Sequence, residues 1–165
     1  MAVIRKAALQ DLRAITEIYN EAVLHTTATF DTTTKTIEEQ RVWYDKHNIK
    51  YPILIAEEEK KIVGWASLSQ YSDRCAYADT AEASVYIKEG HQRKGLGRVL
   101  SEALLKAGRE AKLHTVILRI AEGNAGSLKL AKSLGFKDVG VMKEVGKKFG
   151  KLLDVYIMQL IYEGQ

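Results

Sequence analysis

The sequence has very little of several residue types that define particular classes of protein. Its 165 residues include one cysteine, Cys75, so no intrachain disulfide can form, and zinc sites built from cysteine pairs are excluded. One proline and twelve glycines are too few for linkers or long disordered segments. No apolar run approaches the roughly 18 residues that a membrane span requires. These absences predict a soluble, ordered protein that does not cross a membrane.

The length and the first residues also limit the possibilities. Residues 1–6 run directly into charges, without the apolar core or small-residue cleavage site of a secretory signal. We therefore expect a cytoplasmic location. With 46% apolar residues, the chain is long enough for one well-buried domain and too short for two ordinary ones, at roughly 100–200 residues each. Residues 1–165 are thus expected to form a single domain.

Charge of one sign is not in large excess. The 25 lysines and arginines against 21 acidic residues give a net charge of +4, and both signs are mixed along the chain. A nucleic-acid-binding protein would show a basic stripe interleaved with aromatic residues, so we expect no nucleic acid partner. The strongest basic cluster, residues 143–151, is either a solvated surface or a local anion site.

Hydrophobic periodicity predicts alternating strands and helices. Apolar residues recur at helical spacing over about residues 12–23, and Thr36-x-x-Glu39 is a capping box for a helix over about 36–47. Two further helices are expected, one with a core stripe and one ending at Gly135. The stripe residues are Leu96, Val99, Leu100, Ala103, Leu104 and Ala107. Strands are expected at 3–7, 51–56, 62–68, 82–87, 115–120, 136–143 and 153–161. This order predicts a mixed α/β (α+β) domain with a central sheet.

Residues 88–98 form a glycine-rich basic turn between a predicted strand and a predicted helix. Glycine lets backbone N–H groups approach a ligand closely, and a helix N-terminus adds unpaired donors and the positive end of its dipole. Arg93, Lys94 and Arg98 add positive charge. The turn is therefore either an anion site or a plain glycine-rich loop with solvated basic side chains.

Other familiar motifs do not fit. A P-loop needs Lys-Ser or Lys-Thr after its last glycine, whereas Gly97 is followed by Arg98 and Val99. The dinucleotide fingerprint needs a small residue at Leu100. The four histidines are too widely spaced for a helical metal pair, and no Gly-x-Ser-x-Gly occurs. We expect no metal site.

Gln92-x-x-Gly95-x-Gly97, placed between strand and helix, resembles the pyrophosphate loop of the GNAT acetyltransferases. Residues elsewhere support the resemblance: Ile4 to Asp11 at the first strand, Asn124-x-x-Ser127, and Leu134-Gly135-Phe136. The resemblance spans essentially the whole chain. It implies a mostly antiparallel central sheet flanked by helices and acetyl-CoA as cosubstrate.

Within this family, the chain is similar to the phosphinothricin and methionine-sulfoximine N-acetyltransferase branch. The blocks that carry this similarity are Thr29-Phe30-Asp31, Arg74-x-x-Tyr77, residues 82–87, and residues 145–150 with Asp154. The chain departs from the branch at Lys147 and Leu152, where aromatic residues are expected. The identity of the acceptor therefore stays open.

The resemblance assigns the cofactor contacts to three segments. Val85, Tyr86 and Ile87 would offer backbone groups to the pantetheine arm and thioester, although their side chains can equally be core residues. Asn124 would contact the pantetheine, and it is also placed to be a helix N-cap. The pyrophosphate would be held by Gln92, Arg93, Lys94, Gly95, Leu96, Gly97 and Arg98.

Candidate residues for the reaction and for the acceptor follow. Glu82 precedes Val85 by three residues on one strand and could act as the general base, directly or through a water; otherwise it is a surface glutamate. Arg74 could hold a carboxylate or phosphinyl group, because guanidinium geometry matches such oxyanions; Tyr77 belongs to the same motif. Phe30 could wall the pocket or belong to the core.

One further departure concerns the general acid. The family often has a tyrosine seven residues after the asparagine, and this branch often has histidine there, whereas this chain has Ala131. Water or another group must then protonate the leaving thiolate.

The leading hypothesis is acetylation of the primary amine of a small amino-acid analogue. Acetylation of a protein or peptide amine, and an acetyl-CoA-binding protein without efficient catalysis, remain as alternatives. A homodimer is also expected. The branch usually forms one, and the segment 155–162 is apolar at both alternating sets of positions.

Overall fold

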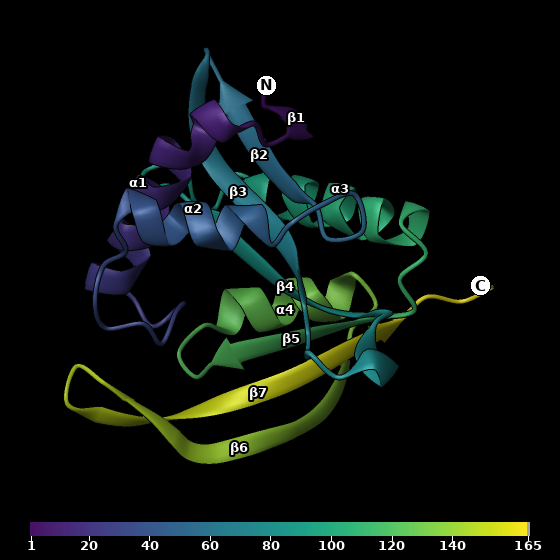
Figure 1. Cartoon of the computed structure of the whole chain (residues 1–165). Helices are drawn as coiled ribbons and strands as arrows, with labels where there is room; N and C mark the ends of the chain where they lie inside the picture. Colours follow the sequence, from purple (N-terminus) through teal and green to yellow (C-terminus); the bar gives the residue numbers. More distant parts are fainter. Residues whose placement is uncertain (165) are drawn as a thin grey trace.

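The computed structural model describes residues 1–164, which form a seven-stranded sheet with helices on both faces (Figure 1). The strands are β1 (Val3–Lys6), β2 (Ile53–Glu58), β3 (Lys61–Gln70), β4 (Thr80–Ile87), β5 (Thr115–Ala121), β6 (Lys137–Lys148) and β7 (Lys151–Ile161). The helices are α1 (Leu12–His25), α2 (Ile37–Asp45), α3 (Leu96–Glu110) and α4 (Ala125–Ser133), with short 3-10 turns at Leu9–Asp11 and Cys75–Tyr77. The predicted fold class and order of elements are confirmed.

The sheet has the strand order β1-β2-β3-β4-β5-β7-β6, and among the described strand pairs only β4–β5 is parallel. A larger core joins α3 and α4 to one face of the sheet. A smaller core joins α1 and α2 to the other face, through β2, β3 and β4. Among the described residues, none from β5, β6 or β7 belongs to that smaller core. The α1/α2 face of the sheet is therefore covered over its first strands only. No helix within residues 1–164 has the length and apolar character needed to cross a bilayer.

Both hairpin turns are shorter than the sequence predicts. The charged run at residues 57–61 was expected to form the first turn, but only Glu59 and Lys60 turn, with φ of 48° and 64°. The second hairpin turns at Phe149 and Gly150, with φ of 51° and 73°. Two consecutive residues with positive φ match the right-handed twist of the paired strands, so the strands continue to the very ends of the hairpins.

Helix α3 buries a narrower stripe than predicted. Leu96, Leu100 and Leu104 are buried, and the stripe continues at Gly108, where Leu68 and Tyr162 leave no room for a side chain. Val99, predicted to belong to the stripe, is 46% exposed, so that prediction is wrong. The buried positions repeat every four residues, and Val99 falls outside this row.

The hairpin β6–β7 contains the basic cluster at residues 143–151. Lys143 pairs with Asp154 at 2.6 Å. The Lys148 side chain is buried and donates from Nζ to the Thr29 carbonyl at 2.8 Å. Burial lowers the pKa of Lys148. Lys148 is therefore not a solvated lysine, whereas Lys143 is 76% exposed and forms its ion pair at the surface.

Most of the exposed apolar side chains of the hairpin β6–β7 lie outside the segment 155–162. Strand β7 is interior, between β5 and β6, and Val155, Met158 and Tyr162 are buried. The edge strand is β6. The exposed large apolar side chains of this hairpin are those of Val139, Val141, Val145, Phe149, Leu152 and Ile161.

The capping box predicted for α2 is formed. Thr36 Oγ1 accepts from the Glu39 N–H at 3.2 Å, and Glu39 Oε2 accepts from the Thr36 N–H at 2.8 Å. We expect Thr36→Ala to lower the free energy of unfolding by about 1 kcal/mol, because N–H groups of the first turn lose an acceptor. The melting temperature should then fall by roughly 2–4 °C.

The matched control for this prediction is Thr34→Ala. Thr34 is exposed, and its side chain makes no hydrogen bond to any residue that the structure describes. Equal melting temperatures for the two variants would contradict a stabilising role of the capping box.

Candidate active site

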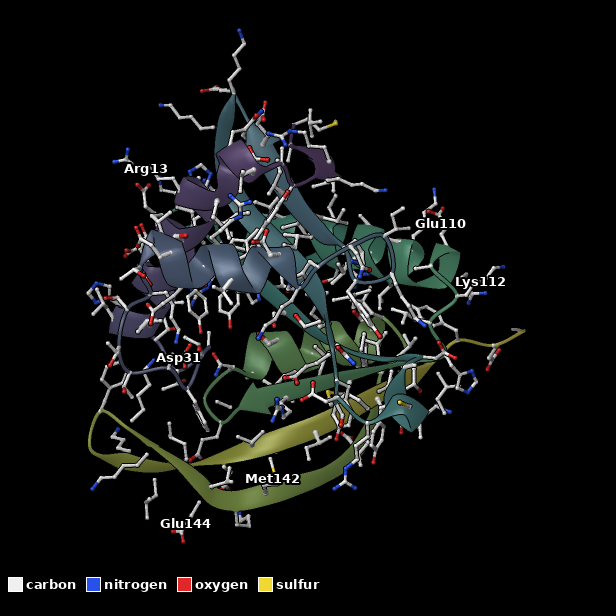
Figure 2. All side chains as sticks on the ribbon, in the orientation of Figure 1. Arg13, Asp31, Glu110, Lys112, Met142 and Glu144 are labelled. Atoms are coloured by element: carbon white, nitrogen blue, oxygen red, sulfur yellow. The ribbon has the colours of Figure 1, made fainter. Side chains whose placement is uncertain are left out.

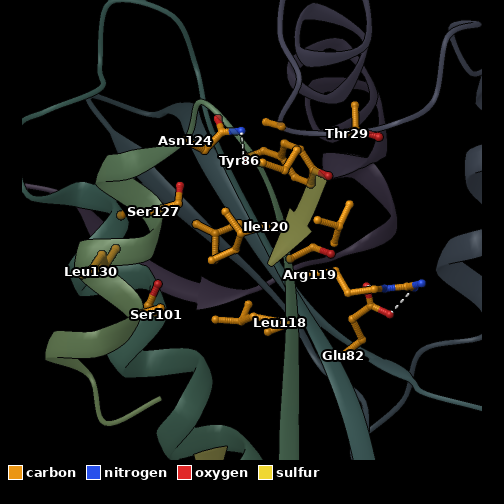
Figure 3. A pocket seen from close by; sticks show the side chains of 18 of the residues that line it. Thr29, Glu82, Tyr86, Ser101, Leu118, Arg119, Ile120, Asn124, Ser127 and Leu130 are labelled. Atoms are coloured by element: carbon orange, nitrogen blue, oxygen red, sulfur yellow. Dashed lines mark hydrogen bonds and ion pairs between the residues drawn. The ribbon is translucent and has the colours of Figure 1, made fainter. Parts of the chain in front are cut away.

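The parallel pair β4–β5 separates after three residue pairs, which run from Thr80–Thr115 to Glu82–Ile117. Beyond Glu82, β4 remains paired with β3 as far as Ile87, and no strand within residues 1–164 pairs with its other edge. A cleft of about 630 Å³ opens there (Figure 3). Its walls come from β4, β5, α3, α4, the start of the α1–α2 connection and the hairpin β6–β7.

Side chains of β4 alternate across the sheet in this region. Val85 and Ile87 pack against the larger core, so their side chains are core residues, as the alternative interpretation predicted. Tyr86 packs on the opposite face against Trp65 and Tyr19. The backbone edge of these residues lines the cleft, and it can still pair with an extended ligand.

The basic turn before α3 presents free backbone donors. Gln92 Nε2 donates to the Ile87 carbonyl at 3.2 Å. Within residues 1–164, no backbone N–H from 92 to 98 donates a hydrogen bond. Gly95 precedes α3 at φ 82° and supplies no capping side chain. The turn therefore holds a row of unpaired N–H groups at a helix N-terminus, as an anion site requires.

The basic side chains of this turn differ in their partners. Arg93 and Lys94 are exposed and make no ion pair with any described residue. Arg98 donates to Glu102 at 3.0 Å and to Ser133 at 2.6 Å, which ties α3 to α4. Leu96 is buried in the larger core, so only its backbone is available to a ligand.

Gly97 and Asn124 lie on the helix side of the cleft. A Cβ on Gly97 would lie 3.7 Å from Leu130 Cδ2. Asn124 occupies the N-cap position of α4 but makes no side-chain capping bond. Its Nδ2 donates instead to the Ala121 carbonyl at 2.9 Å and to Thr27 Oγ1 at 3.3 Å. This geometry joins α4 to the connection between α1 and α2.

Glu82 lies where the two strands separate, and it forms an ion pair that the sequence analysis missed. Both of its oxygens accept from Arg119 of β5, at 2.9 Å from Nε and 2.6 Å from Nη2 (Figure 3). The hydrogen bonds with Glu82 raise the pKa of Arg119. The Glu82 side chain is 24% exposed, so solvent and ligands can still reach it.

A second missed group of residues lies opposite Glu82. Tyr19 donates to Asp31 and shares a hydrogen bond of 2.9 Å with Thr29. Burial raises the pKa of Tyr19, and the hydrogen bond to Asp31 acts in the same direction. Burial also raises the pKa of Tyr86 to about 12. These phenols are therefore protonated near neutral pH.

Phe30 lies in the same connection and lines the cleft. It packs on Gly146 so closely that any Cβ there would collide with its ring. The α1–α2 connection and the hairpin β6–β7 are thus in contact. Figure 2 labels Asp31 on the former and Met142 and Glu144 on the latter. Phe30 is a wall of the cleft.

Arg74 and Tyr77 are not brought to the cleft of their own chain. Both lie in the β3–β4 connection, where Tyr77 packs edge-on against Tyr71 with 5.3 Å between the ring centroids. Neither is among the residues that line the cleft.

At the position of the expected acid, Ala131 is buried and lines the cleft. Ser101 and Ser127 are the nearby hydroxyl groups of α3 and α4 (Figure 3). Across residues 1–164, no three His, Cys, Asp or Glu side chains are grouped to hold a metal ion.

The sequence did contain signals for the missed residues. Arg119 interrupts the apolar run of β5, and a charged residue in an otherwise apolar strand is costly unless it has a partner or function. Asp31 belongs to the Thr29-Phe30-Asp31 block already singled out. Tyr19 belongs to the segment Ile18-Tyr19-Asn20, which resembles the family's first helix, but nothing in that pattern indicated a partner for its hydroxyl group.

Comparisons with known proteins agree with this geometry. The chain matches the acetyltransferase (GNAT) domain over residues 4–157. It is 40% identical over 158 residues to the L-methionine sulfoximine/L-methionine sulfone acetyltransferase of Salmonella typhimurium strain LT2, covering 95% of this chain and 92% of that protein.

Two solved structures superpose over nearly the full length. A GNAT superfamily phosphinothricin acetyltransferase from Sinorhizobium meliloti, in complex with AcCoA, has a TM-score of 0.92 and 32% identity, covering 99% of this chain and 94% of that one. A ribosomal-protein-alanine N-acetyltransferase from Brucella melitensis has a TM-score of 0.93 and 38% identity, covering 97% and 99%. The family match over residues 4–157 includes every residue that lines the cleft.

Proposed function

Because this chain belongs to the GNAT acetyltransferase family, we propose that it acetylates the primary amine of a small amino-acid analogue, using acetyl-CoA, by direct attack in a ternary complex. The observation that carries the proposal is the meeting of the open β4 edge with Glu82 at the bottom of the β4–β5 cleft. Relatives act on amines of this kind, as the names methionine sulfoximine/sulfone acetyltransferase and phosphinothricin acetyltransferase state.

The cleft fits acetyl-CoA in shape and in chemistry. An extended pantetheine arm can pair with the backbone of Val85 to Ile87, which has no strand beside it. The free N–H groups of residues 92–98 suit a pyrophosphate, with Arg93 and Lys94 adding charge. Asn124 is placed to contact the pantetheine from the other side. The thioester of acetyl-CoA supplies the acetyl group, and the CoA thiolate is a good leaving group.

Glu82 is the proposed general base. An acceptor ammonium must lose a proton before its nitrogen can attack, and a carboxylate within reach, directly or through one water, can accept that proton. The nitrogen then bonds to the acetyl carbon while the carbon–sulfur bond breaks and sulfur leaves with the electron pair as the CoA thiolate. The nitrogen releases its second proton to water, which leaves a neutral amide. Because Ala131 carries no acid, water protonates the thiolate in this proposal.

Phe30 is proposed to form a wall of the acceptor site, which its position in the cleft supports. Arg74 and Tyr77 lie outside the cleft of their own chain, so a contact with the acceptor requires a rearrangement or a second copy of the chain. The acceptor assignment therefore depends mainly on residues of the cleft itself.

A thiol-release assay with acetyl-CoA tests the function. We expect free CoA to appear with methionine sulfone, methionine sulfoximine or phosphinothricin, and little with ordinary amino acids. Binding of acetyl-CoA without thiol release for any amine would contradict the proposal and favour the non-catalytic alternative.

A second candidate is acetylation of a protein amine, favoured by the likeness to a structure named ribosomal-protein-alanine N-acetyltransferase. The same assay separates the two functions. Peptides with an N-terminal alanine should release CoA more slowly than methionine sulfone if the small-amine proposal is correct.

We also propose a homodimer formed through the exposed apolar side chains of the hairpin β6–β7. Light scattering at micromolar concentration should give twice the 18.5 kDa of one chain. Val141→Lys should shift the mass toward the monomer, because burying an unpaired charge in an apolar contact is unfavourable. Val3→Lys, at the opposite edge strand β1, is the control. A monomeric mass for the unmodified chain would rule out the dimer.

A further inference from the structure

Arg119 is placed by the end of the β4–β5 ladder. Ile117 is the last residue of β5 to pair with β4, opposite Glu82. Arg119 follows two residues later, so its side chain points to the same face of the sheet as that of Ile117. This is the face that α1 and α2 leave uncovered at β5. Arg119 therefore reaches the cleft next to the proposed base.

The charges around the cleft are few. Of the described residues that line it, Arg119 is the only lysine or arginine, and Asp31 and Glu82 are the only acidic ones. Asp31 already accepts from Tyr19 and lies 3.6 Å from Lys35. An anionic group that enters the cleft thus finds one cation among these lining residues.

Part of the Arg119 guanidinium makes no hydrogen bond to any residue that the structure describes. Its Nε and Nη2 donate to Glu82, whereas Nη1 donates to no atom of residues 1–164. The side chain is 54% exposed. A guanidinium presents five N–H donors in a planar fork that matches carboxylates and similar oxyanions. Arg119 can therefore bind a second oxyanion while it still holds Glu82.

The ion pair is complementary to an α-amino acid, which carries an ammonium and a carboxylate on one carbon. The opposite charges of Glu82 and Arg119 are adjacent, with 2.6 Å between Oε2 and Nη2. We propose that Arg119 binds the acceptor carboxylate through Nη1, so that the ammonium lies against Glu82. This inference rests on the proposed function, and it assigns to Arg119 the role that the sequence suggested for Arg74.

The proposal makes acceptor choice depend on a carboxylate. We expect methionine sulfone to be a better acceptor than 3-(methylsulfonyl)propan-1-amine, which has the same sulfone and a primary amine but no carboxylate. The quantity to measure is the ratio of kcat/KM for the two amines. Intrinsic differences between them cancel when this ratio is compared between variants.

Arg119→Gln is expected to lower this ratio at least tenfold, mainly through a lower kcat/KM for methionine sulfone. Arg119→Lys keeps the charge but loses the fork, and should give an intermediate ratio. The matched control is Arg41→Gln. Arg41 is 51% exposed, pairs with Asp45 at 2.9 Å and does not line the cleft. Melting temperatures check that each variant is folded, and the half-exposed position of Arg119 favours folding.

The outcomes separate two failures. An unchanged ratio in both Arg119 variants, with normal turnover, would overturn the role of Arg119 and leave the proposed function intact. Absence of thiol release from the unmodified protein with either amine would overturn the proposed function and this inference together. A ratio that falls equally in Arg41→Gln would also overturn it, because the effect would then not be specific to the cleft.

Discussion

Replacing Glu82 with glutamine is expected to lower turnover about 10²-fold or more, the scale of losing one general base. Glutamine keeps the size of the side chain and one oxygen that can accept from Arg119, so the contact between β4 and β5 persists. It cannot take the proton of the acceptor ammonium. Affinity for acetyl-CoA should stay unchanged in calorimetry, because no proposed contact with CoA involves the Glu82 side chain.

The control is Glu17→Gln, which removes an exposed carboxylate paired with Arg13 on α1. It should retain full turnover. If Glu82→Gln retains most of its activity at neutral pH, the base is another residue, and Asp31 is the remaining acidic residue in the described lining of the cleft.

Gly97→Val is expected to raise the dissociation constant of acetyl-CoA at least tenfold, about 1.4 kcal/mol. The folded protein should accept the substitution, because a Cβ at Gly97 meets only Leu130 at ordinary contact distance. The branched side chain would then occupy space in the cleft beside the first turn of α3, where the pyrophosphate needs close approach to the backbone. Isothermal titration calorimetry measures the change directly.

Gly126→Val provides the matched control for this prediction. Gly126 is likewise the second residue of a helix, α4, and a Cβ there has no neighbour within 4 Å. Its dissociation constant should equal that of the unmodified chain. Equal constants for both variants would contradict the assignment of the residues 92–98 to pyrophosphate binding.

Local patterns in the sequence were sufficient to predict the elements of the fold. Capping chemistry located the start of α2, and alternating or continuous apolar runs located every strand, because these signals act over a few residues. The order and the family resemblance were confirmed. Strand ends were less predictable. The two-residue turn Glu59-Lys60, for example, leaves the charged residues Glu58 and Lys61 paired within the strands, although a charged run usually indicates a turn. Val99 was misassigned because its position around the helix axis decides whether it faces the sheet. The buried residues of α3 repeat every four residues, and Val99 lies outside that row although it is apolar.

The site was less predictable, because its geometry depends on residues far apart in the chain. The family motif brought out Glu82, Gly97 and Asn124, all of which line the cleft. The pairing of Glu82 with Arg119 depends on where the β4–β5 ladder ends, and no local pattern specifies that point. The contact between Phe30 and Gly146 likewise joins segments that only the folded sheet brings together.

The short parallel ladder also joins two parts of the sheet that are synthesised one after the other. Each antiparallel ladder lies wholly within residues 3–87 or wholly within residues 115–161, and only the three residue pairs between β4 and β5 join these stretches. The first stretch leaves the ribosome complete while the second is still being synthesised, and domains form from the N-terminal end during translation. The cleft therefore lies on the seam between a half of the sheet that is synthesised early and a half that is synthesised late.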